Sequence, residues 1–219
     1  MKRTPAALPI LLILFLMSLA CSGPEVLSQT QDTPRPGAVL FQDDFSNPKS
    51  GWGTLEEGAS RVQYQDGGLR ILVGEAQYDY WSTPGEKYLD TRITVEAARM
   101  SGSDNNDFGI LCRYKDPDNF YALLVSSDGY AGILKVKEGE YNLISGEHMD
   151  YFEAIQKGSA LNRLEAKCAG SKLVLSANGE ELLAVDDFDF MYGEVGVIAG
   201  SYDESGVDIF FDNFIVYNP

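Results

Sequence analysis

The sequence predicts an all-β fold, a two-sheet antiparallel jelly-roll sandwich, preceded by a cleaved leader and a flexible tether. First, short apolar runs separated by turn-forming residues follow one another from residue 39 to the end. Second, no long segment shows the 3.6-residue apolar period of an amphipathic helix. Third, residues 108–136 divide into three consecutive strands at Lys-Asp-Pro-Asp-Asn and Ser-Ser-Asp-Gly, which favour turns. Many short strands at this spacing are typical of sandwiches and jelly rolls.

The first 20 residues have the organisation of a secretory signal peptide. Lys2 and Arg3 form a positive region, residues 10–19 are apolar, and a small residue precedes Cys21. The apolar run is short for a transmembrane helix, which needs about 20 residues. The ending Ser-Leu-Ala-Cys resembles a bacterial lipobox, although Ser18 stands where leucine is typical. The resemblance implies that Cys21 is lipidated and holds the protein in the cell envelope, on the outer face of a bacterial membrane; an ordinary cleaved leader is the alternative.

Residues 21–38 form a predicted linker. They lack apolar periodicity and are rich in Ser, Thr, Gln, Pro and Gly, a composition typical of flexible tethers. Residues 39–219 then form the predicted β-sandwich domain.

The strands of this domain can be placed in order by their turns. We expect hairpins that turn at Gly67-Gly68, at Gly170-Ser171 and at Asn178-Gly179, and Asn-Gly is the strongest short-range hairpin signal. A loop over residues 146–158 could hold one helical turn. Further strands are expected over residues 39–45, 76–82, 90–99, 141–145, 193–202 and 207–217.

The central strands have two rather apolar faces, as expected of strands with little solvent on either side. Phe108, Ile110 and Cys112 alternate onto one face. Arg113 falls on the other face, and we expect Tyr121 of the next strand to join it there as a cross-strand neighbour.

The charge balance and the single histidine exclude several function classes. The formal net charge is −16, and the basic residues are dispersed, so the sequence predicts no nucleic-acid partner. An acidic domain is also poorly suited to anionic lipid headgroups, which leaves the lipid anchor as the expected membrane contact. His148 alone cannot form a multi-histidine metal site.

Four segments resemble the concanavalin A-like, laminin G-like jelly rolls, and the nearest branch is the 3-keto-disaccharide hydrolase-like domain of secreted and lipid-anchored bacterial proteins. These segments are residues 41–52, 108–130, 162–179 and 206–217, with their spaced aromatics, glycines and turns. The resemblance covers residues 39–219. It implies a sandwich that often binds glycans on its concave sheet, whereas activity does not follow from fold.

Aromatic residues are the candidates for saccharide binding, because sugar rings stack their apolar faces on them. Our best candidates are Trp81 and Tyr121, with Arg113 as a forked hydrogen-bond donor. Tyr78, Tyr80 and Tyr130 are further candidates, and packing within the core is the alternative for each residue. Because Tyr80 and Trp81 are neighbours in one strand, one of the two must face outward.

A catalytic pair of carboxylates is not evident. Glycoside hydrolysis needs two carboxylates that flank the scissile bond, and the laminarinase-like relatives carry Glu-x-Asp-x-x-Glu on one strand, a pattern that is absent here. The nearest acidic clusters, Asp186, Asp187 and Asp189 on one side and Asp104 and Asp107 on the other, are expected to be loop caps and solvated charges.

Three functions therefore stay open. The leading hypothesis is a noncatalytic glycan-binding or other ligand-binding module. The second is a glycosidase-type hydrolase of the 3-keto-disaccharide branch, and the third is a structural or protein-interaction module.

A disulfide is expected between Cys112 and Cys168. If Cys21 is lipidated, these two remain in an oxidising compartment, and each lies on the apolar face of its strand. Two buried free thiols are the alternative.

A structural calcium ion is the last expectation. In many jelly rolls of this superfamily an ion ties the first strand to the last, which here would involve Asp43, Asp44 and Asp212. The alternative, which we favour, is that these carboxylates cap turns.

Overall fold

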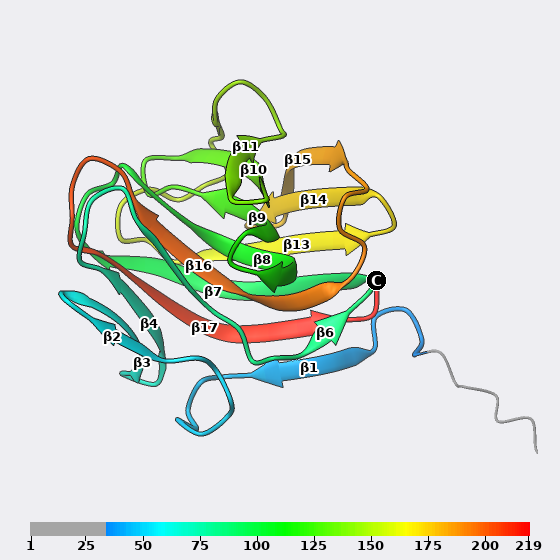
Figure 1. The fold of residues 1–219 in the computed structure, drawn as a ribbon, viewed down its shortest axis with the longest axis horizontal. Coiled ribbons are helices and arrows are strands. Elements are labelled where there is room, and N and C mark those ends of the chain that lie inside the picture. Colours follow the sequence, from blue (N-terminus) through cyan, green and yellow to red (C-terminus); the bar gives the residue numbers. More distant parts are fainter. Residues whose placement is uncertain (1–33) are drawn as a thin grey trace, which may run out of the picture. The chain divides into compact units, whose positions relative to one another are not determined.

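A computed structural model describes residues 34–219, which form 17 β-strands in two antiparallel sheets packed face to face (Figure 1). None of these residues forms a helix, so the described part of the chain contains no helix that could cross a membrane. The predicted two-sheet antiparallel sandwich is confirmed. The predicted leader and Cys21 lie outside the described residues, as does most of the predicted linker.

The nine-stranded sheet, called sheet A, contains both ends of the described chain. Its order is β15 (Glu180–Asp186), β14 (Lys172–Ala177), β13 (Asn162–Ala169), β7 (Thr91–Ser101), β17 (Val207–Tyr217), β4 (Gly68–Val73), β3 (Ser60–Gln65) and β2 (Leu55–Glu57), with β1 (Val39–Asp43) paired to β17.

The eight-stranded sheet, called sheet B, contains the central strands of the sequence. Its order is β11 (Glu140–Leu143), β10 (Tyr130–Lys137), β9 (Asn119–Val125), β8 (Asn106–Asp116), β16 (Gly193–Ser201) and β5 (Asp79–Ser82), with β12 (Asp150–Tyr151) paired to β10 and β6 (Lys87–Tyr88) paired to β16.

Two of the three expected hairpin turns are confirmed. Gly170-Ser171 joins β13 to β14, and Asn178-Gly179 joins β14 to β15 with positive φ at both residues. The third turn lies one residue earlier than expected, at Asp66-Gly67. Gly68 instead begins β4, where a Cβ atom would overlap the ring of Phe210. Glycine is therefore required here by packing rather than by the turn.

The loop over residues 146–158 forms no helical turn. Its residues Asp150 and Tyr151 make the short strand β12, which pairs with Ala131 and Tyr130 of β10. The segment thus lies along sheet B, where Met149 packs over the outer face of the sheet.

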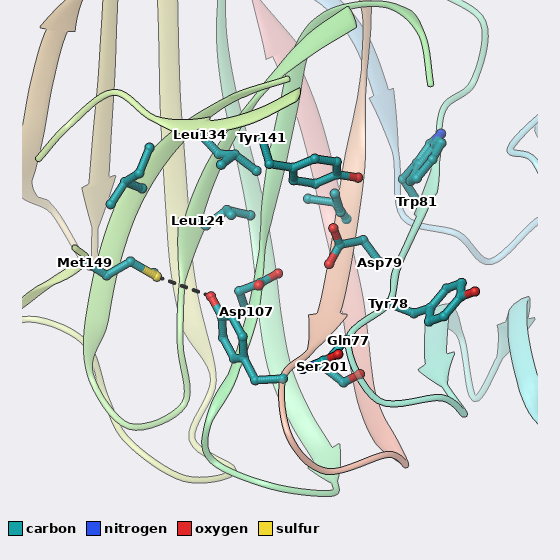
Figure 2. Close-up of a pocket in the computed structure, with 13 residues that line it drawn as sticks. Gln77, Tyr78, Asp79, Trp81, Asp107, Leu124, Leu134, Tyr141, Met149 and Ser201 are labelled. Carbon is teal, nitrogen blue, oxygen red and sulfur yellow. Dashed lines mark hydrogen bonds between the residues drawn. The ribbon is translucent and has the colours of Figure 1, made fainter. Parts of the chain in front are cut away.

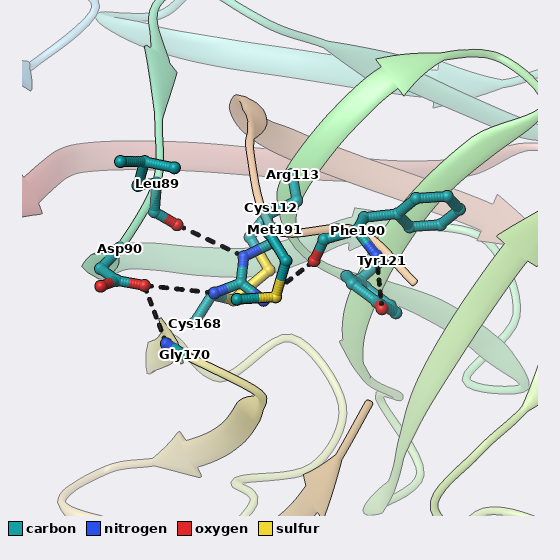
Figure 3. The surroundings of a disulfide bond; sticks show 9 residues. All are labelled: Leu89, Asp90, Cys112, Arg113, Tyr121, Cys168, Gly170, Phe190 and Met191. Carbon is teal, nitrogen blue, oxygen red and sulfur yellow. Dashed lines mark hydrogen bonds and ion pairs between the residues drawn. A yellow bond between two sulfur atoms is a disulfide. The ribbon is translucent and has the colours of Figure 1, made fainter. Parts of the chain in front are cut away.

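The main core lies between the sheets and is crossed by one disulfide. Cys112 of β8 in sheet B is bonded to Cys168 of β13 in sheet A, and both are fully buried (Figure 3). The expected bridge is confirmed. Inward-facing residues of both sheets make up the rest of this core, among them Ile93, Ile110, Leu123, Leu164, Val197 and Phe211.

A second apolar cluster covers the outer face of sheet B. Its buried members are Leu111, Phe120, Ala122, Leu124, Val136 and Ile198. Trp81, Tyr114, Leu134 and Met149 pack on it and shield it in part. Sheet B is therefore apolar on both faces, which explains the nearly continuous apolar runs in its central strands.

Candidate functional site

A groove of about 700 Å³ lies over the outer face of sheet B (Figure 2). Strands β5, β8, β16, β9 and β10 supply its floor, and β11, Met149 and the segment after β16 supply its walls. Its lining is mainly apolar and aromatic: Gln77, Tyr78, Asp79, Trp81, Asp107, Leu124, Leu134, Tyr141, Leu143, Met149, Ile198, Ser201 and Tyr202.

Trp81 occupies one end of the groove because β5 alternates its side chains. Tyr80 packs against the main core, whereas Trp81 lies opposite Ile198 of β16 on the outer face. The Trp81 ring centroid is 5.8 Å from that of Phe120. Tyr78 and Tyr141 add exposed rings along the groove. The expectation that one of Tyr80 and Trp81 faces outward is confirmed, and the outward residue is Trp81.

Two carboxyl groups meet at the floor of the groove. Asp79 of β5 and Asp107 of β8 are both register partners of Gly200, which lies on the strand between them. Since the Oδ1 atoms of both aspartates lie within 2.6 Å of the position that a Cβ atom of Gly200 would occupy, they are at most twice that distance, 5.2 Å, apart. The absent side chain of Gly200 makes room for this approach.

The environment favours the protonated form of both carboxyl groups. Burial, followed by the charge of Asp79, raises the pKa of Asp107 to about 7. Burial raises the pKa of Asp79 to about 6, and interaction with the Tyr141 hydroxyl opposes this. Because two close carboxyl groups titrate together, the pair holds a proton more tightly than free aspartates do.

The tyrosines beside this pair remain protonated. Burial, and then the nearby carboxyl groups, raises the pKa of both Tyr141 and Tyr202. The Tyr202 hydroxyl donates to Met149 Sδ at 3.6 Å, an interaction drawn in Figure 2. The groove thus combines hydroxyl donors, carboxyl acceptors and aromatic faces, which can bind a sugar ring and its hydroxyls.

The prediction that Tyr121 lies on this exposed face is wrong. Its register partner on β8 is Cys112, so the two share the inner face, and Tyr121 is 0% exposed. Its hydroxyl donates to Asp187 and accepts from the Phe190 amide at 3.1 Å. Tyr121 is a packing residue between the sheets, and we do not include it in the site.

The expectation that Arg113 faces the groove is also wrong. The pairing of β8 with β9 is irregular between Cys112 and Asp116, and Arg113 has a φ of 55°. This bulge interrupts the alternation, so that Tyr114 packs on the outer cluster and the Arg113 side chain is buried. Its guanidinium donates to the carbonyl oxygens of Phe190 and Leu89 and pairs with Asp90 (Figure 3).

The acidic clusters turn out to differ from each other. Asp187 accepts a hydrogen bond from the amide of Asp189 at 3.0 Å and pairs with Lys135, as expected of a turn cap. Asp186 accepts from Ser171 Oγ at 2.8 Å, and Asp104 pairs with Arg99. Asp107 was expected to be a solvated cap, and this is wrong. It lies within β8 and is only 6% exposed.

The predicted calcium ligands make local hydrogen bonds. Asp43 accepts from the Phe45 amide at 2.8 Å and from Trp52 Nε1 at 3.0 Å, and Asp44 accepts from Ser46. Asp212 accepts from the neighbouring Asn213 amide at 2.7 Å. Within residues 34–219 no group of three or more His, Cys, Asp or Glu side chains is placed to hold a metal ion. Calcium binding here stays a prediction, which the effect of a chelator on the melting temperature would test.

Sequence reasoning did not assign the polar residues Asp79, Asp107, Tyr141 and Tyr202 to the site. Asp79 precedes Trp81 by two residues, so strand alternation alone places both on one face. Asp107, Tyr141 and Tyr202 come from other elements, and only the strand order and register bring them to Asp79.

Comparison with solved structures supports the fold. The carbohydrate-binding module CBM66 from Bacillus subtilis matches with a TM-score of 0.61 at 15% identity, over 77% of this chain and 96% of that one. A Bacillus subtilis protein of unknown function with a galectin-like fold matches with a TM-score of 0.62 at 13% identity, over 84% and 98%.

An enzyme also contains this fold as one part. A xylan β-1,4-xylosidase from Bacillus halodurans matches with a TM-score of 0.58 at 16% identity, over 81% of this chain but 39% of the enzyme. No protein-family model and no curated protein matches the sequence. At these identities the likeness shows the two-sheet β-sandwich fold and nothing finer.

Proposed function

We propose that this protein is a surface-anchored lipoprotein whose β-sandwich binds a saccharide noncatalytically in the groove on sheet B. The observation that carries the proposal is the groove itself, in which Trp81 and three tyrosines surround a floor that ends in two carboxyl groups. Sugar rings stack their apolar faces on such aromatic rings, and their hydroxyls donate to carboxylates.

The structural relatives give supporting context for this choice. One is described as a carbohydrate-binding module, and this chain covers almost all of it. A shallow, open site of this kind binds modestly, with a dissociation constant on the order of millimolar to micromolar.

A glycan array followed by calorimetric titration tests the binding. The wild-type chain should bind a defined set of saccharides, and Trp81→Ala should lose that binding. Tyr192→Ala, which removes an exposed ring outside the groove, serves as the matched control. If the wild-type chain binds no saccharide, the proposal fails, and a structural or protein-interaction role becomes the better one.

The envelope location is a separate part of the proposal and rests on the N-terminal sequence alone. Cys21→Ser should release the protein or leave an unprocessed precursor. Unchanged membrane fractionation together with unchanged processing would refute the lipid anchor.

The second candidate function is hydrolysis of a glycosidic bond, as in the 3-keto-disaccharide hydrolase-like branch. The specific observation in its favour is the Asp79–Asp107 pair, because glycoside hydrolysis uses two carboxyl groups that lie close together. A pair that shares a proton supplies one acid and one carboxylate. Turnover of 3-keto-disaccharides or of chromogenic glycosides, abolished by Asp107→Asn, would establish it, and absence of turnover on both substrate classes would exclude it.

A further inference from the structure

The groove contains two acidic groups without a basic partner among the described residues. Among the described residues that line it, only Asp79 and Asp107 are acidic, and none is Lys, Arg or His. Neither carboxyl group belongs to any ion pair formed within residues 34–219. Elsewhere in the described chain, by contrast, the buried Asp208 is paired with Arg70.

One acceptor atom of this pair has no donor. The Oδ1 atom of Asp107 is buried and has no hydrogen-bond partner among the described residues, although the Tyr202 hydroxyl interacts with the carboxyl group and lowers its pKa in part. Buried polar atoms of native proteins nearly always have a partner, so an exception at the floor of a groove indicates a group that arrives from outside. The Oδ1 atoms of Asp79 and Asp107 both lie within 2.6 Å of the position that a Cβ atom of Gly200 would occupy. They are therefore at most 5.2 Å apart, so one small group can reach both oxygens.

The surrounding rings fit the same kind of group. Tyr141 stands beside Asp79, and Tyr202 stands beside Asp107. Trp81 completes the wall on the β5 side (Figure 2). Aromatic faces attract cations as well as sugar rings, and the attraction is larger where water is displaced.

We propose that the groove selects a saccharide that carries a protonated amine, with the ammonium group between Asp79 and Asp107 and the sugar ring against Trp81. This inference rests on the proposed saccharide-binding function and names the chemical class of the ligand. An ammonium group offers three donors and no acceptor, so it can satisfy Asp107 Oδ1 and Asp79 at once. Hydrogen bonds between ionised partners are about twice as strong as neutral ones, which gives the amine its advantage over a hydroxyl.

Paired oligosaccharides test the inference. The probes are the β-1,4-linked trimer of glucosamine and its fully N-acetylated counterpart, which share rings and linkages and differ in charge at nitrogen. Calorimetric titration of the full chain at pH 7 should give at least about tenfold tighter binding of the amine. Asp79→Asn and Asp107→Asn should each remove most of this preference while the N-acetylated trimer still binds.

Controls separate the inference from the proposed function. Asp186→Asn removes the same charge from an exposed position on sheet A and should keep the preference. Melting temperatures of all variants show whether they are folded. Equal affinity for the two trimers overturns the inference and leaves saccharide binding intact. No binding of either trimer also overturns the inference, and the glycan array then decides separately whether the chain binds any saccharide. An amine preference that disappears on addition of a chelator also overturns it, because the carboxyl pair would then hold a metal ion.

Discussion

The two faces of sheet B differ in whether their buried polar groups have hydrogen-bond partners among the described residues. On the inner face the Tyr121 hydroxyl has a donor and an acceptor, and Cys112 is bonded to Cys168. On the outer face of β8, Asp107 Oδ1 is buried and has no hydrogen-bond partner among the described residues.

The carboxyl groups associated with the two faces show what this difference means. Burial raises the pKa of Asp187, but hydrogen bonds from Lys135 and Tyr121 outweigh it, and the net shift is downward. Burial and the charge of Asp79 raise the pKa of Asp107, and the hydrogen bond from the Tyr202 hydroxyl opposes this only in part, with no cation of the described residues beside it. The inner face is therefore arranged for stability, whereas the outer face keeps an unfavourable arrangement that a ligand can relieve.

The largest expected effect is on the inner face. Replacing both Cys112 and Cys168 by Ala removes a bridge between residues 56 apart in sequence, and should lower the free energy of unfolding by about 4 kcal/mol in the chain-entropy model. Urea unfolding monitored by fluorescence measures the change. Saccharide binding by the folded variant should persist. An unchanged urea midpoint would contradict the stabilising role.

Asp107→Asn should act in the opposite direction, because it removes an unfavourable charge from the outer face. The pKa of Asp107 is higher in the folded than in the unfolded chain, so the folded state loses stability as the pH rises from about 4 to about 7. Asn does not titrate. The variant should therefore match the wild type near pH 4 and exceed it at pH 8 by about 4 kcal/mol, because folding raises the pKa from about 4 to about 7 and each pH unit is worth about 1.4 kcal/mol.

Melting curves at the two pH values measure this difference, with the exposed Asp186→Asn as control. A variant that is less stable at pH 8 would show that the Asp107 carboxylate has a partner that the structure does not contain.

Trp81→Ala tests the role of the outer face of sheet B through its effect on saccharide binding. The ring packs on Phe120 and Tyr114 while one side faces the groove, so its loss should weaken saccharide binding about tenfold or more. Because the ring is only partly buried, the cost in stability should stay near 1–2 kcal/mol, below that of a core tryptophan. Titration at a temperature well below the melting transition separates the two effects. Retained affinity would remove Trp81 from the site.

The smallest effect is expected for Tyr121→Phe. The hydroxyl group is lost, and the Phe190 amide loses its acceptor, which should cost about 1 kcal/mol. Saccharide affinity should be unchanged because the ring is enclosed between the sheets. A loss of affinity without a loss of stability would instead restore Tyr121 as a ligand contact, as the sequence had predicted.

Local signals in the sequence predicted most of the fold. The turn at Asn178-Gly179 could be predicted because these two residue types readily adopt the positive φ angles that it needs. Strand alternation alone predicted that Cys112 and Cys168 lie in the core. These features depend on neighbouring residues, which is why they could be inferred without a structure.

The candidate site depended on register and on a bulge, which are not local. We assigned Arg113 to the outer face by assuming regular alternation along β8, but the irregular pairing after Cys112 interrupts that alternation. We assigned Tyr121 to the same face without knowing that its partner on β8 is Cys112. Asp79 and Asp107 are far apart in sequence and meet only because β16 pairs with both of their strands. An outward-facing aromatic residue in β5 was predicted correctly because alternation within that strand was enough to assign one of Tyr80 and Trp81 to the outer face.

Gly200 supplies a criterion for recognising other proteins with the same site. A single methyl group at this position would occupy the space between the two carboxyl groups and keep a ligand out, while the strand pairing around it could persist. Homologues that share the sandwich but carry alanine or a larger residue here would then lack this arrangement of carboxyl groups without losing the fold. The combination of Asp-x-Trp on one strand, Asp at the start of a second and Gly on the strand between them can therefore identify distant relatives that share the carboxyl pair.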